Sequence, residues 1–214
     1  MAKASSDAQR RGGRPTQAEA AALHLRIREA AVRTFLENGY DATTMVAIAE
    51  AAGIAKPTLY ARYPDKRAVF LDVIPWAFSR AVPVDTGDAA DEQDLRAALV
   101  AIGEGALRQA LDPDIVQLHR IARNEAHRFP EFALSADSLG WARRQRQVMD
   151  LLARHAESGA IEVDDIELAA EHFLAMVEVL PARLADFGLY RSQKEERRRL
   201  LHAVDLFLRG VLPR

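Results

Sequence analysis

A short polar stretch in the first third of the chain carries side chains that suit contact with a nucleic acid. Its outward-facing members are Lys56, Thr58, Tyr60, Arg62 and Tyr63. Lysine and arginine neutralise phosphate, and threonine and tyrosine hydroxyls bond phosphate or base edges. Pro57 and the Tyr60 ring can contact thymine methyl groups. The stretch therefore predicts DNA contact, although a helical hairpin with a polar face would show the same pattern.

Two short helices joined by a tight turn would position these side chains. Thr44 can cap the first helix, and Gly53 permits a left-handed turn after it. Lys56-Pro57 starts the second helix, because proline is tolerated in a first turn. The apolar residues that face a small core beneath are Ile48, Ala49, Ala52, Ile54 and Leu59. This arrangement predicts a helix-turn-helix, whose second helix is narrow enough to enter the major groove of DNA.

The charge distribution also points to a polyanion at this end. Residues 1–70 carry eleven Lys/Arg and seven Asp/Glu, whereas residues 71–214 carry eighteen and twenty-four. We expect residues 1–15 to form a flexible basic arm, in which Arg11 and Arg14 flank two glycines. Arginine is drawn to the negative potential of an A·T-rich minor groove. A frayed basic tail would have the same composition.

The rest of the chain predicts helices, because apolar residues recur at helical spacing and strand signals are nearly absent. We expect nine helices, over residues 16–38, 44–52, 56–64, 65–81, 91–111, 112–129, 130–158, 164–188 and 192–210. Pro75 and Pro181 each predict a kink or an earlier helix end. Asp164 with Glu167, and Ser192 with its Glu three residues on, predict capping boxes. The predicted fold is all-α, with a helix-turn-helix domain over 16–64 and a larger helical domain over 65–214.

The composition excludes several functional classes. The chain has 214 residues, of which 49% are hydrophobic and 28% charged, as in an ordinary globular protein. It has no cysteine, which excludes disulfides and thiol chemistry and fits a reducing cytoplasm. No apolar run approaches the ~18 residues of a membrane span, and the basic start is not a secretory signal. The histidines are not spaced as metal ligands, so we expect no metal. No phosphate-binding loop, nucleophile elbow or acid/base pair stands out, so we expect no cofactor and no catalytic residues.

The order of motifs in this region resembles the TetR/AcrR family of bacterial transcriptional regulators. The resemblance covers about residues 14–72 and rests on these pairs of residues at fixed spacing: Gly39-Tyr40, Thr43-Thr44, Ile48-Ala49, Ala52-Gly53, Leu59-Tyr60 and Asp65-Lys66. It implies an all-helical homodimer with an N-terminal DNA-binding domain and a C-terminal domain that binds a small-molecule effector.

The resemblance also implies roles for single residues in binding double-stranded DNA. Thr44 should touch phosphate at the start of the second helix, and Tyr63 and Lys66 should hold phosphate. The residues that should lie in the major groove are Lys56, Pro57, Thr58 and Tyr60. The apolar pair Val46-Ala47 departs from the family pattern, which often has a polar residue there.

Two sets of residues in the C-terminal part are candidates for the dimer interface and the effector pocket. Apolar stripes on the last two long helices predict a four-helix contact between two copies. Its residues are Phe173, Val177, Leu180, Leu184, Leu200, Val204, Phe207 and Leu208. Mixed aromatic, flexible and polar side chains predict pocket walls at His119, Arg123, Trp141, Gln145, Met149 and Met176.

The function that follows is a cytoplasmic repressor, released from a palindromic operator by a small molecule. The alternatives are an all-helical enzyme that uses the acidic cluster Asp164, Asp165 and Glu167 with the C-terminal histidines, and a ligand-binding protein whose helix-turn-helix no longer reads DNA. The intact polar stretch between Lys56 and Lys66 favours the regulator, because neither alternative requires it.

Overall fold

The computed structural model describes residues 16–81 and 94–212, with the side chains of residues 81 and 130–140 excepted. These residues form helices and no strand. The helices are α1 Gln17–Ala42, α2 Met45–Ala51, α3 Lys56–Tyr60, α4 Lys66–Ala81, α5 Leu95–Ala110, α6 Pro113–Glu125, α7 Pro130–Glu157, α8 Ile166–Leu174, α9 Leu180–Asp186 and α10 Gln193–Val211. A π-helical turn over Ala175–Val179 joins α8 to α9. With these three counted as one helix, the described residues form nine helices, and the all-α prediction is confirmed.

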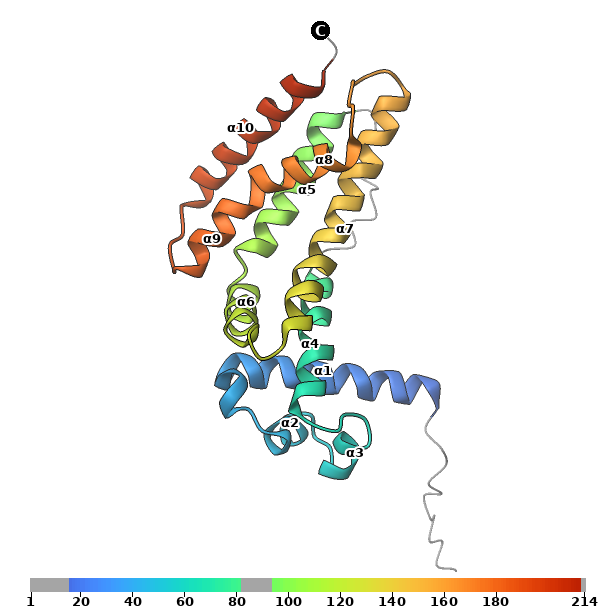
Figure 1. Cartoon of the computed structure of the whole chain (residues 1–214), viewed down its shortest axis with the longest axis vertical. Coiled ribbons are helices and arrows are strands. Elements are labelled where there is room, and N and C mark those ends of the chain that lie inside the picture. The colour runs from blue at the N-terminus through green and yellow to red at the C-terminus, as the bar shows by residue number, and fades with distance from the viewer. Residues whose placement is uncertain (1–15, 82–93, 213–214) are drawn as a thin grey trace, which may run out of the picture.

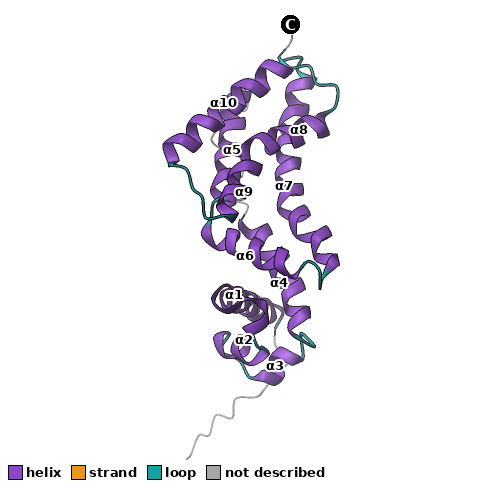
Figure 2. Ribbon diagram, turned by 60° about the vertical axis from the view of Figure 1, so that its left-hand side comes forward, coloured by secondary structure: helices purple, strands orange, loops and turns teal. Residues whose placement is uncertain are grey.

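The helices are arranged as a small lower part and a larger upper bundle (Figure 1). α1 lies across the junction, with α2 and α3 beneath it. α4 rises from α3 past α1 into the upper bundle, where it lies beside α7 (Figure 2). α4 is therefore the element that leads directly from the helix-turn-helix to the rest of the molecule.

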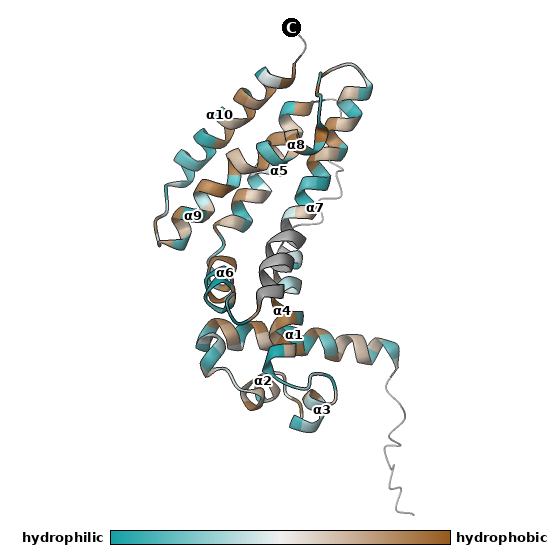
Figure 3. Ribbon diagram, viewed as in Figure 1, coloured by the Kyte–Doolittle hydropathy of each residue, from teal (hydrophilic) through white to brown (hydrophobic). Residues whose placement is uncertain are grey.

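Two apolar clusters form the core. The first joins buried residues of α1 to α4 with the α6 residues Ile115, Leu118 and Ile121. Apolar residues of α4 gather where it meets α1 (Figure 3). The second cluster joins α5, α7, α8, the π-helical turn and α10. α4 and α6 thus pack with the helix-turn-helix, so the apolar core does not end where that motif ends.

Side-chain caps set most helix starts, as the sequence predicts. Asp112 accepts hydrogen bonds from the first turn of α6. α5 begins after its cap Asp94, whereas the predicted start at residue 91 lies outside the described residues. The cap of α8 is Asp165, whose carboxylate accepts from the backbone N–H of Leu168 at 3.0 Å. The cap therefore lies one residue later than predicted, and the predicted box of Asp164 with Glu167 is wrong, because the third residue after Asp165 is Leu168.

The capping box predicted for α10 is only half formed. Ser192 accepts from the backbone N–H of Glu195 at 3.2 Å, as predicted. The Glu195 carboxylate instead accepts hydrogen bonds from Arg198 and Arg199 one turn later. Two guanidinium groups within reach compete successfully with one backbone N–H for the carboxylate.

The two internal prolines do not end their helices. α4 continues through Pro75 to Ala81. Before Pro181 the helix widens into the π-helical turn and then continues as α9. Proline lacks the N–H that would bond the carbonyl four residues earlier, which here belongs to Val177 in that turn. The irregular turn thus lies where the regular hydrogen bond is lost.

Candidate nucleic-acid interface

The turn between α2 and α3 has the geometry that the sequence predicts. The Thr44 hydroxyl accepts from the backbone N–H of Ala47 at 3.1 Å and caps α2. Gly53 has a φ of 63°, in the left-handed region that favours glycine. The N–H of Ile54 then donates to the carbonyl of Ala49 at 3.0 Å, which closes the turn. The predicted helix-turn-helix is confirmed.

α3 presents one face to solvent and one residue to the core. Leu59 is fully buried, with 0% exposure. The exposed side chains are Lys56, Pro57, Thr58 and Tyr60, together with Arg62 just after the helix. Tyr60 is 50% exposed although its ring is apolar. The predicted outward face is confirmed for Lys56, Thr58, Tyr60 and Arg62 but not for Tyr63, and its contact with DNA remains a prediction.

The sequence does not predict the hydrogen bonds by which Arg26 holds the turn between α2 and α3. The Arg26 guanidinium on α1 donates to the carbonyl of Ala52 at 2.9 Å and reaches that of Gly53 at 3.5 Å. These carbonyls lie at the end of α2, where the helix leaves its last carbonyls without internal partners. A cation at a helix C-terminus also interacts favourably with the helix dipole. Arg26 thus fixes the angle at which α3 leaves α2.

Lys66 lies at the first turn of α4 and joins it to the end of α1. Its ammonium donates to the carbonyls of Tyr40 at 2.6 Å and Asp41 at 3.0 Å. It also lies 4.4 Å from the centre of the Tyr40 ring. Burial lowers the pKa of this ammonium. Two of its three protons are therefore used within the protein, and one remains for the predicted phosphate contact.

The sequence-based orientation of Tyr63 is wrong. Its side chain is 6% exposed, and its hydroxyl donates to the Asp72 carboxylate on α4 at 2.5 Å. Burial, together with the Asp72 carboxylate, raises the pKa of this phenol, which therefore keeps its proton. Because that single proton goes to Asp72, Tyr63 donates within the protein and not outward to phosphate.

The Asp72 carboxylate has three polar partners: His24 and Arg28 on α1, and Tyr63 just after α3. Arg28 donates to both of its carboxylate oxygens, at 3.0 and 2.6 Å, and His24 lies 3.4 Å from Oδ2. Burial works against ionisation of Asp72, but hydrogen bonds from Arg28 and Tyr63 outweigh it and hold its pKa at about 2. This network ties α1, α4 and the segment after α3 together.

The remaining predicted DNA contacts are only partly described. Thr44, which caps α2, is exposed, and Val46 is partly buried. Arg11 and Arg14 lie outside the described residues, so the basic arm stays a prediction.

Two family models match the chain on either side of this junction. Residues 27–73 match the model described as bacterial regulatory proteins, tetR family. Residues 97–210, more than half of the chain, match the C-terminal domain of AefR-like transcriptional repressors. The chain belongs to the TetR family of bacterial transcriptional regulators.

Relatives and solved structures agree with membership of the TetR family. An HTH-type transcriptional regulator of Mycobacterium bovis is 35% identical over 82 residues, which cover 37% of this chain and 42% of the relative. The chain thus matches less than half the length of that relative. A regulator FrrA, described as flavonoid-responsive, is 29% identical with a TM-score of 0.71, over 91% of this chain and 99% of that one. A TetR-family regulator from Mesorhizobium loti, 24% identical over 93% and 100% of the two chains, shares the fold with a TM-score of 0.74.

Most of the residues predicted for the TetR dimer interface lie in the core of this chain. The buried ones are Phe173, Val177, Leu200, Val204 and Phe207, none more than 8% exposed. Leu184 and Leu208 are partly buried, and Leu180 is 49% exposed. The prediction is wrong for Phe173, Val177, Leu200 and Val204, because these residues face the second apolar cluster of the same chain. Phe207 packs in that cluster but also lines an open groove, so its part in an interface stays a prediction.

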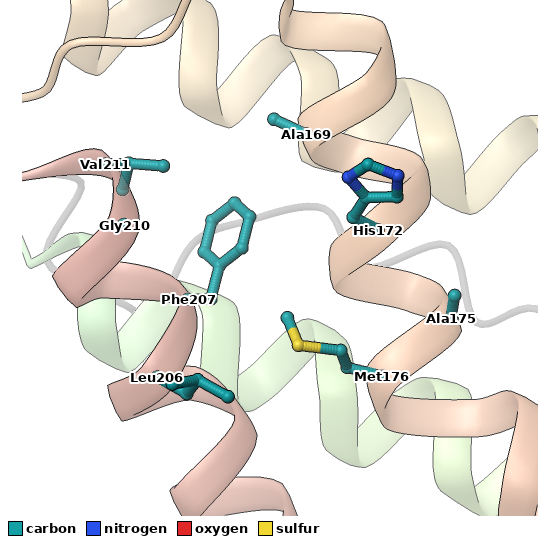
Figure 4. A pocket seen from close by; sticks show the side chains of 8 residues that line it. All are labelled: Ala169, His172, Ala175, Met176, Leu206, Phe207, Gly210 and Val211. Atoms are coloured by element: carbon teal, nitrogen blue, oxygen red, sulfur yellow. The ribbon is translucent and has the colours of Figure 1, made fainter.

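An apolar groove between α8 and α10 is open to solvent (Figure 4), and we call it the open groove. Its lining residues are Ala169, His172, Ala175, Met176, Leu206, Phe207, Gly210 and Val211. Leu206 is 52% exposed and Met176 40%. Leu168 on α8 and Val179 in the π-helical turn are also about half exposed. The sequence pattern missed most of these residues because they lie beside the broader buried stripes.

The six predicted pocket residues do not form one site. Met176 lines the open groove, whereas Trp141 and Met149 pack against the second apolar cluster. His119 stacks on the Phe78 ring, with centroids 4.2 Å apart. Arg123 pairs with Asp186, and Gln145 is partly buried on α7. Grouping Met176 with the others is therefore wrong.

Among residues 16–81 and 94–212, no three His, Asp or Glu side chains gather as metal ligands would. None of the described helices is long and apolar enough to cross a membrane.

Proposed function

We propose that this protein is a repressor that binds an inverted-repeat operator as a homodimer and releases it when a small molecule binds. The exposed face of α3 carries the proposal, because a short helix with Lys56, Thr58 and Tyr60 outward and Leu59 inward suits the major groove. Lys66 and Thr44 would bond phosphate. Because its partner would be genomic DNA, we place the protein in the cytoplasm.

Selection from random duplex DNA tests this function. Two copies of α3 on a two-fold axis must read inverted half-sites about one helical turn apart or somewhat more. We expect palindromic sequences to be enriched and their binding to weaken steeply with salt. Tyr60→Ala should abolish the enrichment, whereas Tyr190→Ala should not, since that tyrosine is similarly exposed at 54% but precedes α10. Failure to enrich any inverted repeat at low salt would reject the proposal.

The open groove between α8 and α10 is the surface that we propose for dimerisation. It takes the place of most of the stripe residues as the candidate interface, with Met176 and Leu206 in the groove and Leu168, Val179 and Leu180 exposed on the adjoining segments. Half-exposed apolar side chains this close together favour burial against a second copy. Leu206→Glu should convert the dimer to a monomer in sedimentation experiments, whereas Leu25→Glu, on α1, should not.

Two likenesses support a repressor that responds to an effector. The C-terminal match is to a domain described as a transcriptional repressor, and FrrA is described as flavonoid-responsive. We therefore propose a small organic effector for this protein as well. A coupling of 1–3 kcal/mol is typical of such switches, so effector should weaken operator affinity by ~5–150-fold. Operator must then weaken effector affinity by the same factor, which a titration in both directions measures.

A further inference from the structure

A pair of opposite charges is buried inside the upper bundle. Arg144 on α7 and Glu178 in the π-helical turn have side chains only 11% and 7% exposed, and Nη2 of the arginine lies 3.1 Å from Oε2 of the glutamate. Arg144 also donates to the side-chain oxygen of Gln109 on α5. The Gln109 amide in turn donates to the backbone carbonyl of Phe78 on α4 at 3.0 Å. We call Gln109, Arg144 and Glu178 the buried polar cluster.

Stability alone does not account for this cluster. Removing two charges from water is costly, and replacement of a buried ion pair by apolar residues of similar volume is often neutral or stabilising. Burial raises the pKa of Glu178, and the Arg144 guanidinium opposes that rise. The glutamate also sits in a π-helical turn, an irregularity frequently found at functional sites. Both features suggest that the cluster has a role in binding.

Two atoms of the pair have hydrogen-bonding capacity left over. Among the described residues, Nε of Arg144 has no hydrogen-bond partner, and Oε2 of Glu178 faces Nη2 in the ion pair but accepts no well-aligned hydrogen bond, although both atoms are buried. The first is a donor and the second an acceptor. Nε is two covalent bonds from the Nη2 atom that faces Oε2, so the free donor and the free acceptor capacity lie on the same side-chain pair.

The chemistry of these two atoms selects one kind of group. A hydroxyl donates one hydrogen bond and accepts another through the same oxygen. A carboxylate only accepts, and it would bring a negative charge towards Glu178. An ammonium only donates, and it would bring a positive charge towards Arg144. A neutral hydroxyl therefore completes the cluster without like-charge repulsion.

We propose that the buried polar cluster anchors the effector through a neutral hydroxyl group on an otherwise apolar molecule. The apolar body follows from the neighbours of Arg144 on the same face of α7, which are Trp141 and the fully buried Val148. The proposal rests on the effector response proposed above and specifies its chemical class. Hydrogen bonds to charged groups favour such a ligand by roughly ten- to a hundred-fold over one without the hydroxyl.

The cluster also reaches the helix that leads to the DNA-binding motif. The Phe78 carbonyl belongs to the last turn of α4, where carbonyls have no partner within the helix. Gln109 supplies that partner and is itself held by Arg144. A ligand hydroxyl that is bonded to Arg144 is therefore separated from the end of α4 only by the Gln109 side chain.

Naphthol, methoxynaphthalene and naphthoate test the proposal as matched probes. They share one apolar body and carry a hydroxyl, an acceptor-only ether and a carboxylate. Titration calorimetry on the full chain without DNA should show naphthol binding at least about ten-fold more tightly than either of the others. Equal binding of naphthol and methoxynaphthalene, stronger binding of naphthoate, or no binding of any probe would overturn the proposal.

A double variant separates a binding role from a structural one. Arg144→Met with Glu178→Met replaces the pair by apolar residues of similar volume, so the protein should fold with an unchanged or higher Tm. It should bind naphthol and methoxynaphthalene equally, whereas the control Arg146→Met, exposed on the same helix, should keep the preference for naphthol. Retention of that preference in the double variant would overturn the proposal.

The failure of this site is distinguishable from failure of the regulator. If selected palindromes are bound but naphthol shows no preference, the anchor is wrong and DNA recognition stands. If naphthol binds with the expected preference but no palindrome is enriched, the proposed regulation fails and the anchor stands.

Discussion

The hydroxyl of Tyr63 lies 2.5 Å from Oδ2 of Asp72, one helix away along the chain. Tyr63 lies in the segment between α3 and α4, and Asp72 lies in the second turn of α4. Arg28 holds the same carboxylate from α1. The orientation of α3 is thus set from behind by a polar network that touches none of its exposed residues.

Tyr63→Phe should lower stability and weaken DNA binding without changing which sequence is preferred. It removes one hydrogen bond to a partly exposed carboxylate, so the free energy of unfolding should fall by about 1–2 kcal/mol. Urea unfolding measures this change, and selection from random DNA measures preference. Tyr190→Phe is the matched control and should leave both unchanged. A shifted consensus for Tyr63→Phe would mean that the hydroxyl reads bases directly.

Acid should weaken this network in a defined pH range. The pKa of Asp72 is held at about 2, below its ordinary 3.8, so its contribution is fully present above the ordinary value and is lost as the pH falls towards about 2. Because the carboxylate is 29% exposed, we expect about 1 kcal/mol. Asp72→Asn should be less stable near neutral pH and should lose stability less steeply on acidification. An equally steep loss of stability on acidification in wild type and variant would contradict the assignment.

Phosphate contact and base reading should separate between Lys66 and Thr58. Lys66→Ala should weaken binding to all sequences and flatten the salt slope by about one, since the slope counts phosphates neutralised. It should also reduce stability, because two bonds to the end of α1 are lost. Thr58→Ala should cost about 1–3 kcal/mol at particular base pairs only. Affinity measured over a salt series on matched and mismatched duplexes tests both. The assignment fails if Lys66→Ala changes base preference and Thr58→Ala does not.

Two glycines of α5 should respond in opposite ways to alanine. A Cβ on Gly103 would collide with Leu200 Cδ1 of α10, whereas a Cβ on Gly105 would meet open space. Gly103→Ala should therefore destabilise the protein by about 1–3 kcal/mol, eased somewhat because the Leu200 side chain can move. Gly105→Ala should stabilise it by about 0.5–1 kcal/mol through helix propensity. Thermal unfolding of the pair checks the close approach of α5 and α10, which a similar Tm for both variants would disprove.

Local signals in the sequence were sufficient for the DNA-binding motif. Thr44, Gly53 and Pro57 each act within a few residues of themselves, so caps and turns were predictable. The buried position of Tyr63 was not, because its partner Asp72 becomes visible only when α4 packs against α1. A tyrosine with an apolar ring and a polar tip fits either environment.

The C-terminal part was harder to predict for a different reason. Helical periodicity shows that a helix has an apolar face, but not whether that face meets its own chain or another. The sequence pattern assigns Phe173 and Phe207 to a partner, yet their rings pack on each other within the chain, with centroids 5.3 Å apart. The buried polar cluster left no local pattern at all, since Gln109, Arg144 and Glu178 come from distant segments.

The apolar cluster shared by α1, α4 and α6 bears on how TetR-family parts can be recombined. Residues 27–73 and 97–210 match separate family models, which suggests interchangeable halves. Yet Ile115, Leu118 and Ile121 of α6 complete the core around α1. A chimera that transplants only the first 81 residues onto another effector domain would meet a foreign α6 surface at that core. Engineering a sensor with new DNA specificity from this protein requires grafting the matching face of α6 as well.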